Sequence, residues 1–192
     1  MRAIILASNS SRRKEILENL GVDFQVIGSN IDEKIDGQLS PVEIAKYFAY
    51  AKARDVSDKL NGHHVVIGAD TVVECGKILG KPQNKYDAYN MLRFLSGKAH
   101  RVITGFAIID CLMGQQFIDH ESTRVYFKEL KDQEIRNYIA TDEYIGKAGA
   151  YAIQGKASLF IEKIEGDYFN VVGLPVFKLG VALCDNFNID LL

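Results

Sequence analysis

Apolar residues gather along the chain in short runs that predict buried strands. The run at 3–7 is uninterrupted, and the run at 65–69 ends at Asp70 and is continued by 71–73. This continuous character is typical of strands that are covered on both faces, whereas half-exposed strands alternate. The residues 74–77 predict a hairpin turn after the second run. Further strands are predicted at 24–27, 100–110, 116–126 and 158–164.

Five segments show the features of helices. The first covers 11–20, with its apolar residues on one face and Gly21 as a natural stop. The second begins at Ser40-Pro41-Val42-Glu43, where Ser40 and Glu43 can form a capping box and proline occupies a position that needs no donor. This helix is expected to end near residue 59. Three more helices are predicted at 84–95, 132–141 and 175–186.

The alternation of strands and helices, interrupted by hairpins, indicates the α/β class with a mixed sheet rather than a regular βαβ repeat. No internal repeat, low-complexity segment or linker divides the chain, and 192 residues can bury a sizeable core. We therefore predict one domain over residues 1–192, with a mixed twisted sheet that is flanked by helices.

Composition and charge exclude several classes of function. Apolar residues make up 47% and charged residues 25% of the chain, which is typical of globular proteins. A net charge of -2 gives no general attraction to nucleic acid or to an anionic membrane, and we expect neither as a partner. Any anion site must therefore come from a local cluster of basic groups.

Cysteine usage points to the compartment. Cys75, Cys111 and Cys184 are odd in number and widely spaced, which disfavours a disulfide framework or a zinc site and fits a reducing environment. No stretch approaches the ~20 apolar residues of a membrane span, and 3–7 is too short for the core of a signal peptide. We therefore expect a cytoplasmic protein.

The first candidate for chemistry is the run Ser8-Asn9-Ser10-Ser11-Arg12-Arg13, between a buried strand and a helix. The free N–H groups of a first helical turn favour an anion, and Arg12 and Arg13 add forked donors that suit phosphate oxygens. A capped helix with two solvated arginines explains the same residues equally well.

The second candidate is Asp70, in the sequence Gly68-Ala69-Asp70-Thr71 at the end of an apolar run. Strand ends are where open α/β sheets bind ligands, so Asp70 could hold a divalent metal or deprotonate a water molecule. A lone aspartate that caps a turn is the more common case.

Three further charged residues are weaker candidates. Lys81 lies in Leu79-Gly80-Lys81-Pro82, where it could meet a phosphate or simply occupy an exposed turn. Lys52 falls on the second helix, where an extended lysine on the surface is the default. Glu33 lies among Asp32, Lys34 and Asp36, a run that also describes a solvated loop.

Two glycine-containing segments could pass close to a ligand. The first is 146–155, with three glycines and with Gln154, whose amide can donate and accept as recognition of a base edge requires. The second is Asn170-Val171-Val172-Gly173-Leu174-Pro175. Both segments are also compatible with plain structural turns. Neither a P-loop nor the Gly-x-Gly-x-x-Gly fingerprint of dinucleotide folds is present, and the histidines show no metal-ligand spacing.

Together these segments resemble the Maf family of nucleoside triphosphate pyrophosphatases. The matching segments, in family order, are Leu6-Ala7-Ser8-Asn9-Ser10-Ser11-Arg12-Arg13, Gly68-Ala69-Asp70-Thr71-Val72-Val73, Leu79-Gly80-Lys81-Pro82, Ser96-Gly97 with His100 and Thr104-Gly105, Ala148-Gly149 through Tyr151-Ala152-Ile153-Gln154-Gly155, and Asn170-Val171-Val172-Gly173-Leu174-Pro175. One departure is Ser11, where the family usually has proline. Since serine can cap a helix where proline can begin one, we expect little functional change.

The resemblance implies an inosine-triphosphate-pyrophosphatase-like fold with two lobes around a cleft. It also implies hydrolysis of a nucleoside triphosphate to the monophosphate and pyrophosphate, with Asp70 as the catalytic acidic residue. Arg13, Thr71 and Gln154 match positions linked to substrate choice. The remaining positions that would line the active site are Ser8, Arg12, Glu33, Lys52 and Lys81.

The segment 151–155 is similar to the branch of the family that acts on dTTP and UTP. Gln154 could then pair with the O4/N3 edge of the pyrimidine. A divalent cation, Mg²⁺ or Mn²⁺, would be held by Asp70 and Glu33 with phosphate oxygens. Activity on 7-methyl-GTP or another modified nucleotide, and a non-enzymatic role in cell division, stay open as alternatives. The resemblance is compatible with a homodimer, although the sequence does not determine the oligomeric state.

Overall fold

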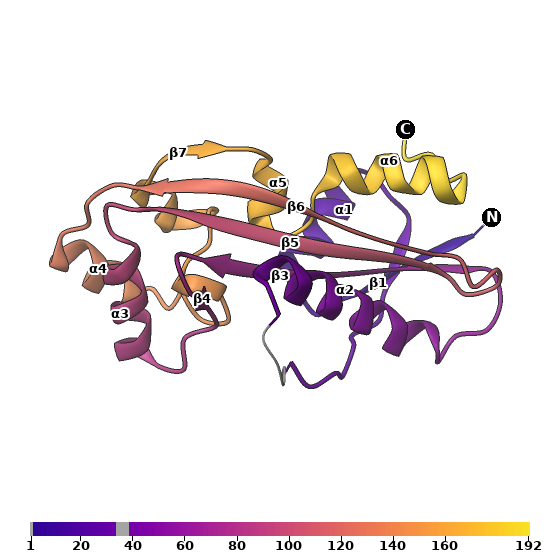
Figure 1. The fold of residues 1–192 in the computed structure, drawn as a ribbon, viewed down its shortest axis with the longest axis horizontal. Coiled ribbons are helices and arrows are strands. Elements are labelled where there is room, and N and C mark those ends of the chain that lie inside the picture. Colours follow the sequence, from indigo (N-terminus) through magenta and orange to yellow (C-terminus); the bar gives the residue numbers. More distant parts are fainter. Residues whose placement is uncertain (1, 34–38) are drawn as a thin grey trace.

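Seven strands form one sheet within residues 2–33 and 39–192, the part of the chain that the computed structural model describes (Figure 1). Their order is β2-β1-β3-β5-β6-β7, and the short β4 pairs with β3. β1 is parallel to β2 and β3, whereas β5, β6 and β7 follow in antiparallel pairs, so the predicted mixed sheet is confirmed. The strands are β1 (Ala3–Ala7), β2 (Phe24–Val26), β3 (His64–Glu74), β4 (Ile78–Leu79), β5 (Ala99–Asp110), β6 (Gln116–Phe127) and β7 (Ile161–Glu165).

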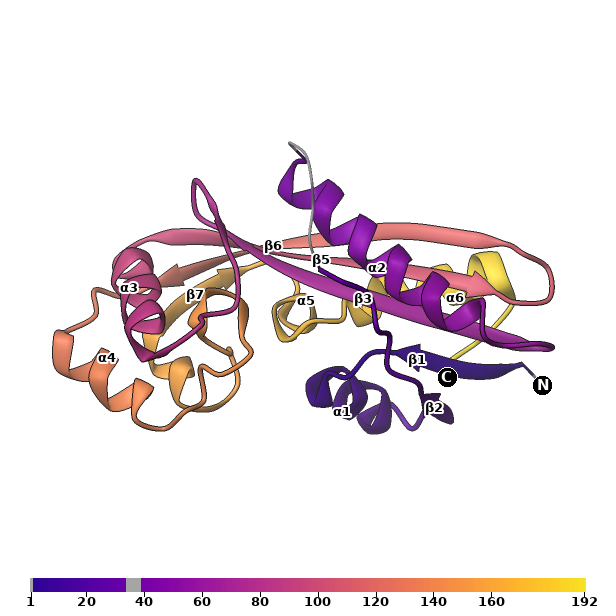
Figure 2. The ribbon, with the colours of Figure 1, turned by 90° about the horizontal axis from the view of Figure 1, so that it is seen from below.

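Helices cover both faces of this sheet. The long strands β3, β5 and β6 run along the molecule, with α2 on one side and α1 and α6 on the other (Figures 1 and 2). The helices are α1 (Ser11–Asn19), α2 (Pro41–Ser57), α3 (Lys85–Leu95), α4 (Asp132–Ile139), η1 (Ala148–Ala150), η2 (Gly155–Phe160), α5 (Tyr168–Val172) and α6 (Val176–Phe187). None of the helices in the described ranges is long and apolar enough to cross a membrane.

The apolar run of β1 faces two different cores. Ile4 and Leu6 pack with residues of α1 and α6, whereas Ile5 and Ala7 pack with residues of α2. Successive side chains of a strand point to opposite faces, so a strand with helices on both sides has no polar position along its length. A third core joins α3 and α4 to the far ends of β5 and β6. The molecule therefore has two lobes that share the long strands, as Figure 1 shows.

The sequence-based boundaries agree with the structure within two residues, except near the C-terminus. The predicted strand at 158–164 is wrong in its first half, because the 3-10 helix η2 occupies this segment and β7 begins only at Ile161. Ala157 and Phe160 are both buried at a spacing of three, and the Ser158 hydroxyl donates to the Gly155 carbonyl at 2.7 Å. The helix α5 was not predicted, since five residues are too few to show a period.

The start of α1 also differs from expectation. Ser11 does not cap the helix; it is the first helical residue, and Ser10 holds the N-cap position without a side-chain hydrogen bond to the helix. The Ser10 N–H instead donates to the Ser8 hydroxyl at 3.2 Å. The position of Ser11 is one where proline is tolerated, because the first N–H groups of a helix have no partner within it. At α2, by contrast, the predicted capping box of Ser40 and Glu43 is confirmed.

Two glycines bring α2 into backbone contact with the sheet. A Cβ atom added to Gly68 of β3 would lie 2.3 Å from the carbonyl oxygen of Ala49. A Cβ atom added to Gly105 of β5 would lie 2.3 Å from the carbonyl oxygen of Ala45. Gly105 is the cross-strand partner of Asp70, so the helix passes beside this aspartate. The position of α2 therefore depends on the absence of side chains at both points.

We expect the substitution Gly105→Ala to lower the free energy of unfolding by about 3 kcal/mol, because the new methyl group collides with helix backbone that cannot rotate away. Urea titration followed by circular dichroism measures this change. Gly180→Ala is the matched control: a Cβ atom on Gly180 of α6 meets nothing within 4 Å, and alanine favours a helix, so stability should stay equal or rise. Equal stability of the two variants would contradict the proposed contact.

Candidate active site

A cleft of about 390 Å³ lies where the two lobes meet. Its polar wall comes from the loop after β1, the start of α1, the end of β3 and the turn after β4. The rest of the lining includes the segments 145–148, 151–153 and 171–172. The predicted site residues that line it are Ser8, Arg12, Arg13, Glu33, Lys52, Asp70, Thr71 and Lys81.

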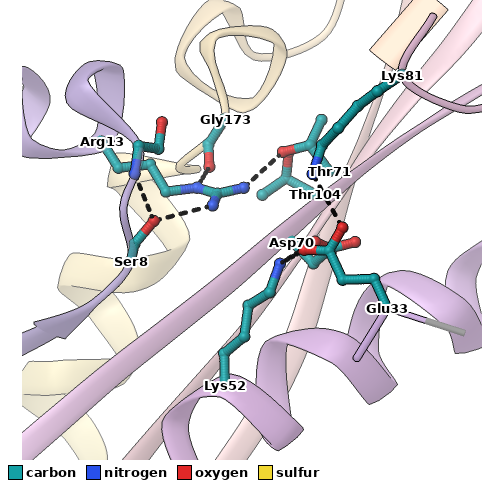
Figure 3. A network of polar contacts seen from close by, with 10 residues as sticks. Ser8, Arg13, Glu33, Lys52, Asp70, Thr71, Lys81, Thr104 and Gly173 are labelled. Carbon is teal, nitrogen blue, oxygen red and sulfur yellow. Dashed lines mark hydrogen bonds and ion pairs between the residues drawn. The ribbon is translucent and has the colours of Figure 1, made fainter. Parts of the chain in front are cut away.

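Arg13 is a buried cation at the centre of a hydrogen-bond network (Figure 3). Its Nε donates to the carbonyl of Gly173 at 2.7 Å, Nη1 to the Ser8 hydroxyl at 3.2 Å and Nη2 to the Thr71 hydroxyl at 3.0 Å. Desolvation lowers the pKa of Arg13 from its ordinary value, and the negative charge of Asp70 opposes that effect. The guanidinium therefore connects α1, β3 and the loop after α5 and holds positive charge inside the cleft wall.

Arg12 is held less firmly than Arg13. Within the described residues its one hydrogen bond runs from Nε to the carbonyl of Val172 at 3.3 Å. Burial is the main effect that lowers the pKa of Arg12. Because Arg12 is half-buried and lines the cleft, its terminal nitrogens can meet an anion there. The alternative of two solvated arginines is therefore wrong for Arg13 and does not describe Arg12 well.

Lys52 joins two carboxylates across the cleft floor. Its Nζ lies 2.5 Å from Asp70 Oδ1 and 2.7 Å from Glu33 Oε1, and Lys81 Nζ lies 2.9 Å from Glu33 Oε2 (Figure 3). Lys52 is 8% exposed, although it falls on a helix where an extended surface lysine was the default expectation. The four charges alternate in sign, so each one offsets the desolvation of its neighbour.

The ion pairs of this network strongly shift the pKa of Glu33. Partial burial raises its pKa, but hydrogen bonds from Lys52 and Lys81, together with their charges, outweigh that effect and lower the pKa to about 2. The side chain of Glu33 is therefore deprotonated and negatively charged at neutral pH. Lys34 and Asp36, which belong to the same charged run in the sequence, lie outside the described residues.

The glycine-rich segment forms one wall of the cleft. Gly149 has a φ of +68°, and a Cβ atom there would lie 3.1 Å from Val73 Cγ1, so glycine lets the loop pass close to β3. Its N–H donates to the Gly80 carbonyl at 3.0 Å, which ties this wall to the turn that carries Lys81. Gln154 does not line the cleft, although Ala152 and Ile153 do. Its predicted contact with a base stays a prediction.

The sequence suggested no chemical role for three buried polar side chains behind the cleft, although Thr104 and Asn170 lie in two of the ordered motifs. Thr104, Thr123 and Asn170 are each 0% exposed, and their hydrogen bonds connect Thr71 to residues of β5, β6 and α5. A fourth, His100, contacts the hydroxyl of the cleft residue Tyr151 through Nε2 at 2.7 Å, and burial lowers the pKa of His100 to about 4. The sequence contained one signal for this group of polar residues. Thr104 interrupts the apolar run of β5, and a buried hydroxyl there needs a hydrogen-bond partner because an unpaired one would be costly.

The match to the sequence model described as Maf-like protein extends over residues 3–186. The chain belongs to the Maf family. A protein of Alkaliphilus oremlandii named dTTP/UTP pyrophosphatase is 62% identical over 192 residues and all of both chains. Proteins with the same name are 52% identical in Alkaliphilus metalliredigens, over all of both chains, and 49% identical in Bacillus anthracis, over 99% of this chain and 98% of the relative. The family membership predicted from the ordered motifs is thus confirmed.

Similarity of this Maf protein to solved structures is lower. The Ham1 protein of Staphylococcus aureus is 16% identical, covers 66% of this chain and 72% of its own, and has a TM-score of 0.46. A nucleoside-triphosphatase described as dITP/XTP pyrophosphatase from Mycobacterium abscessus is 13% identical, covers 65% and 74%, and has a TM-score of 0.40.

The lowered pKa of Glu33 predicts that the free energy of unfolding depends on pH. Its folded-state pKa of about 2 lies below the ordinary value of 4.5, so its carboxylate stabilises the fold above pH 4.5 and that contribution is lost as the pH falls toward 2. The variant Glu33→Gln should therefore lose less unfolding free energy than the wild type over this pH window, as measured by urea titration at a series of pH values.

A carboxylate of β7 provides the control for this measurement. Glu162 is exposed and its carboxylate makes no hydrogen bond or ion pair with another described residue, so Glu162→Gln should keep the pH dependence of the wild type. If Glu33→Gln and the wild type decline in parallel between pH 4.5 and pH 2, the ion-pair network does not stabilise the fold.

Proposed function

We propose that this chain hydrolyses dTTP and UTP to the corresponding monophosphate and pyrophosphate. The observation that carries the proposal is the juxtaposition, in one cleft, of Asp70 with the cations Lys52, Lys81 and Arg12. The full-length relatives named dTTP/UTP pyrophosphatase, at 62% and 52% identity, support this choice of substrates.

We propose that Asp70 acts on the attacking water. Its Oδ1 is held by Lys52 at 2.5 Å, whereas Oδ2 makes no hydrogen bond with any residue that the structure describes. A carboxylate with one fixed and one available oxygen can orient a water molecule toward the α-phosphorus and accept its proton. Lys52 thus serves as a positioning residue for Asp70.

The cations neutralise the charge that grows on the leaving pyrophosphate. Arg12 has terminal nitrogens available toward the cleft, and Lys81 has a flexible ammonium that is more than half exposed. Arg13 has three of its donors occupied by Gly173, Ser8 and Thr71, so it contributes a fixed positive field and shapes the cleft wall. Direct contact with the phosphates would therefore fall to Arg12 and Lys81, whereas Arg13 would act through its charge.

The donor set also fits a divalent cation. Asp70 and Glu33 are two carboxylates that contact the same ammonium, that of Lys52, and two carboxylates with substrate phosphates are the ligands that Mg²⁺ commonly takes. Among the described residues no group of three or more His, Cys, Asp or Glu could hold a metal without the substrate. We propose that Asp70 and Glu33 hold Mg²⁺ or Mn²⁺, which would supply charge stabilisation to the triphosphate.

The cysteines support a proposal about the compartment. Cys75, Cys111 and Cys184 are all free thiols, as expected in a reducing environment, and we propose the cytoplasm. A homodimer stays a prediction that the resemblance alone supports.

The nucleotide panel is the first test. We expect the purified protein with Mg²⁺ or Mn²⁺ to release monophosphate and pyrophosphate from dTTP and UTP faster than from CTP, ATP or GTP, as measured by ion-exchange chromatography of the products. A clear preference for 7-methyl-GTP would instead favour the alternative specificity. Release of orthophosphate alone would contradict the proposed reaction. No turnover of any nucleotide would contradict it as well and would favour a non-enzymatic role.

The variant Asp70→Asn tests the role of the carboxylate. We expect turnover of UTP to fall by roughly 10²- to 10⁴-fold, because the amide cannot accept the proton of the water. Binding of a non-hydrolysable UTP analogue, measured by calorimetry, should change far less. Asp58→Asn, at the exposed end of α2, is the control and should keep wild-type turnover. Full activity of Asp70→Asn would rule out Asp70 as the proton acceptor.

A further inference from the structure

The hydroxyl of Thr104 has a fixed direction of donation. Thr104 is 0% exposed, and its Oγ1 lies 2.8 Å from the backbone carbonyl oxygen of Asn170. A carbonyl can only accept, so the single proton of the Thr104 hydroxyl is committed to this bond. Toward any other neighbour Thr104 Oγ1 can act only as an acceptor.

This commitment fixes the hydroxyl of Thr71. Thr71 Oγ1 lies 3.0 Å from Thr104 Oγ1, and because Thr104 can only accept, Thr71 is the donor. Thr71 Oγ1 also accepts from Arg13 Nη2 at 3.0 Å, since a guanidinium has no acceptor. The proton and one lone pair of Thr71 are therefore occupied. Thr71 lines the cleft, so it offers a ligand one remaining lone pair and no proton.

The side chain of Asn170 holds in place the backbone carbonyl that accepts the Thr104 proton. Its Oδ1 accepts from the backbone N–H of Thr104 at 3.0 Å, and its Nδ2 donates to the Val102 carbonyl at 2.9 Å. Since one neighbour can only donate and the other only accept, the amide cannot be flipped. Nδ2 also donates to Thr123 Oγ1 at 2.9 Å, and Thr123 in turn donates to the Asp167 carbonyl. The donor and the acceptor of each hydrogen bond from Thr123 of β6 to Thr71 in the cleft are thus determined by backbone groups.

The hydroxyl of Ser8, on the other side of Arg13, can donate to a ligand, whereas that of Thr71 can only accept. Its Oγ accepts from Arg13 Nη1 and from the backbone N–H of Ser10, each at 3.2 Å. Its own proton is donated to no residue in the described ranges, so Ser8 offers the cleft a donor. A phosphate oxygen, which accepts hydrogen bonds, suits Ser8. The acceptor at Thr71 requires a ligand group that carries a proton.

We propose that Thr104 and Asn170 are positioning residues that make Thr71 an acceptor for the N3–H group of thymine or uracil. This inference rests on the proposed function. Thymine and uracil both carry a proton on N3, whereas N3 of cytosine is an acceptor and would meet the lone pair of Thr71 unfavourably. The Thr71 hydroxyl would then select dTTP and UTP against CTP. Thr104 and Asn170 set the direction of this hydroxyl without touching the nucleotide.

The substitution Thr104→Val tests this assignment, because it removes the acceptor for the Thr71 proton and lets Thr71 turn to donate. We expect the ratio of kcat/KM for UTP to that for CTP to fall by about tenfold, which corresponds to the loss of one matched hydrogen bond. Thr104→Ser restores the hydroxyl and should keep the wild-type ratio. Thr141→Val, which removes another hydroxyl that donates to a backbone carbonyl but lies outside the cleft lining, is the matched control.

A merely structural role of Thr104 would lower activity on UTP and CTP by the same factor, and an unchanged ratio in folded Thr104→Val would overturn the proposal. A fall of the ratio in Thr104→Ser as large as in Thr104→Val would do the same. If the wild type hydrolyses neither UTP nor dTTP, the proposed function fails first, and the inference fails with it.

Two analogues keep the proposal testable on the wild-type protein if Thr104→Val does not fold. N3-methyl-UTP lacks the ring donor but keeps the sugar hydroxyls, and its kcat/KM should be at least about tenfold below that of UTP. The analogue 3′-deoxy-UTP keeps the ring donor and should lose much less. Equal use of N3-methyl-UTP and UTP, or a loss confined to 3′-deoxy-UTP, would show that Thr71 does not accept from the ring.

Discussion

The backbone contact between α2 and the sheet is the constraint on which the cleft depends. At Gly68 and Gly105 the helix carbonyls occupy the space that a side chain would fill, so α2 lies unusually close to β3 and β5. Lys52 extends from this helix to Asp70 of β3 and reaches it at 2.5 Å. A helix displaced outward by a methyl group would carry the ammonium away from both Asp70 and Glu33, and two adjacent carboxylates would lose their common counterion.

A buried guanidinium connects the other wall of the cleft to the same strand. Arg13 is tolerated in the interior because Gly173, Ser8 and Thr71 each accept one of its hydrogen bonds. These acceptors come from segments that lie far apart in the sequence, so the arginine fixes their relative positions as well as placing a charge. Thr71 follows Asp70 directly in β3, and successive side chains of a strand face opposite ways. One strand therefore serves the lysine network on one face and the arginine network on the other.

The strand and helix pattern was largely predictable, because burial on both faces leaves a continuous apolar run such as that of β1. The prediction failed where no period of two or 3.6 exists. The segment 155–160 buries residues at a spacing of three, and α5 has only five residues. Lys52 illustrates a different limit: nothing in its neighbours along α2 distinguishes a buried lysine from an extended surface one. Its role depends on Glu33 and Asp70, which precede and follow it at long range.

The sequence by itself determined the α/β class, the ends of most helices and strands, the family and the identity of the residues around the cleft. These depend on local spacing, capping and ordered motifs, which a chain carries without folding. The tertiary structure decided the pairing of Lys52 with two carboxylates, the burial of Arg13 and the directions of the Thr71 and Thr104 hydroxyls. Each of these is set by partners on other strands and helices. A proton is assigned to one oxygen or another only when all neighbouring donors and acceptors are in place.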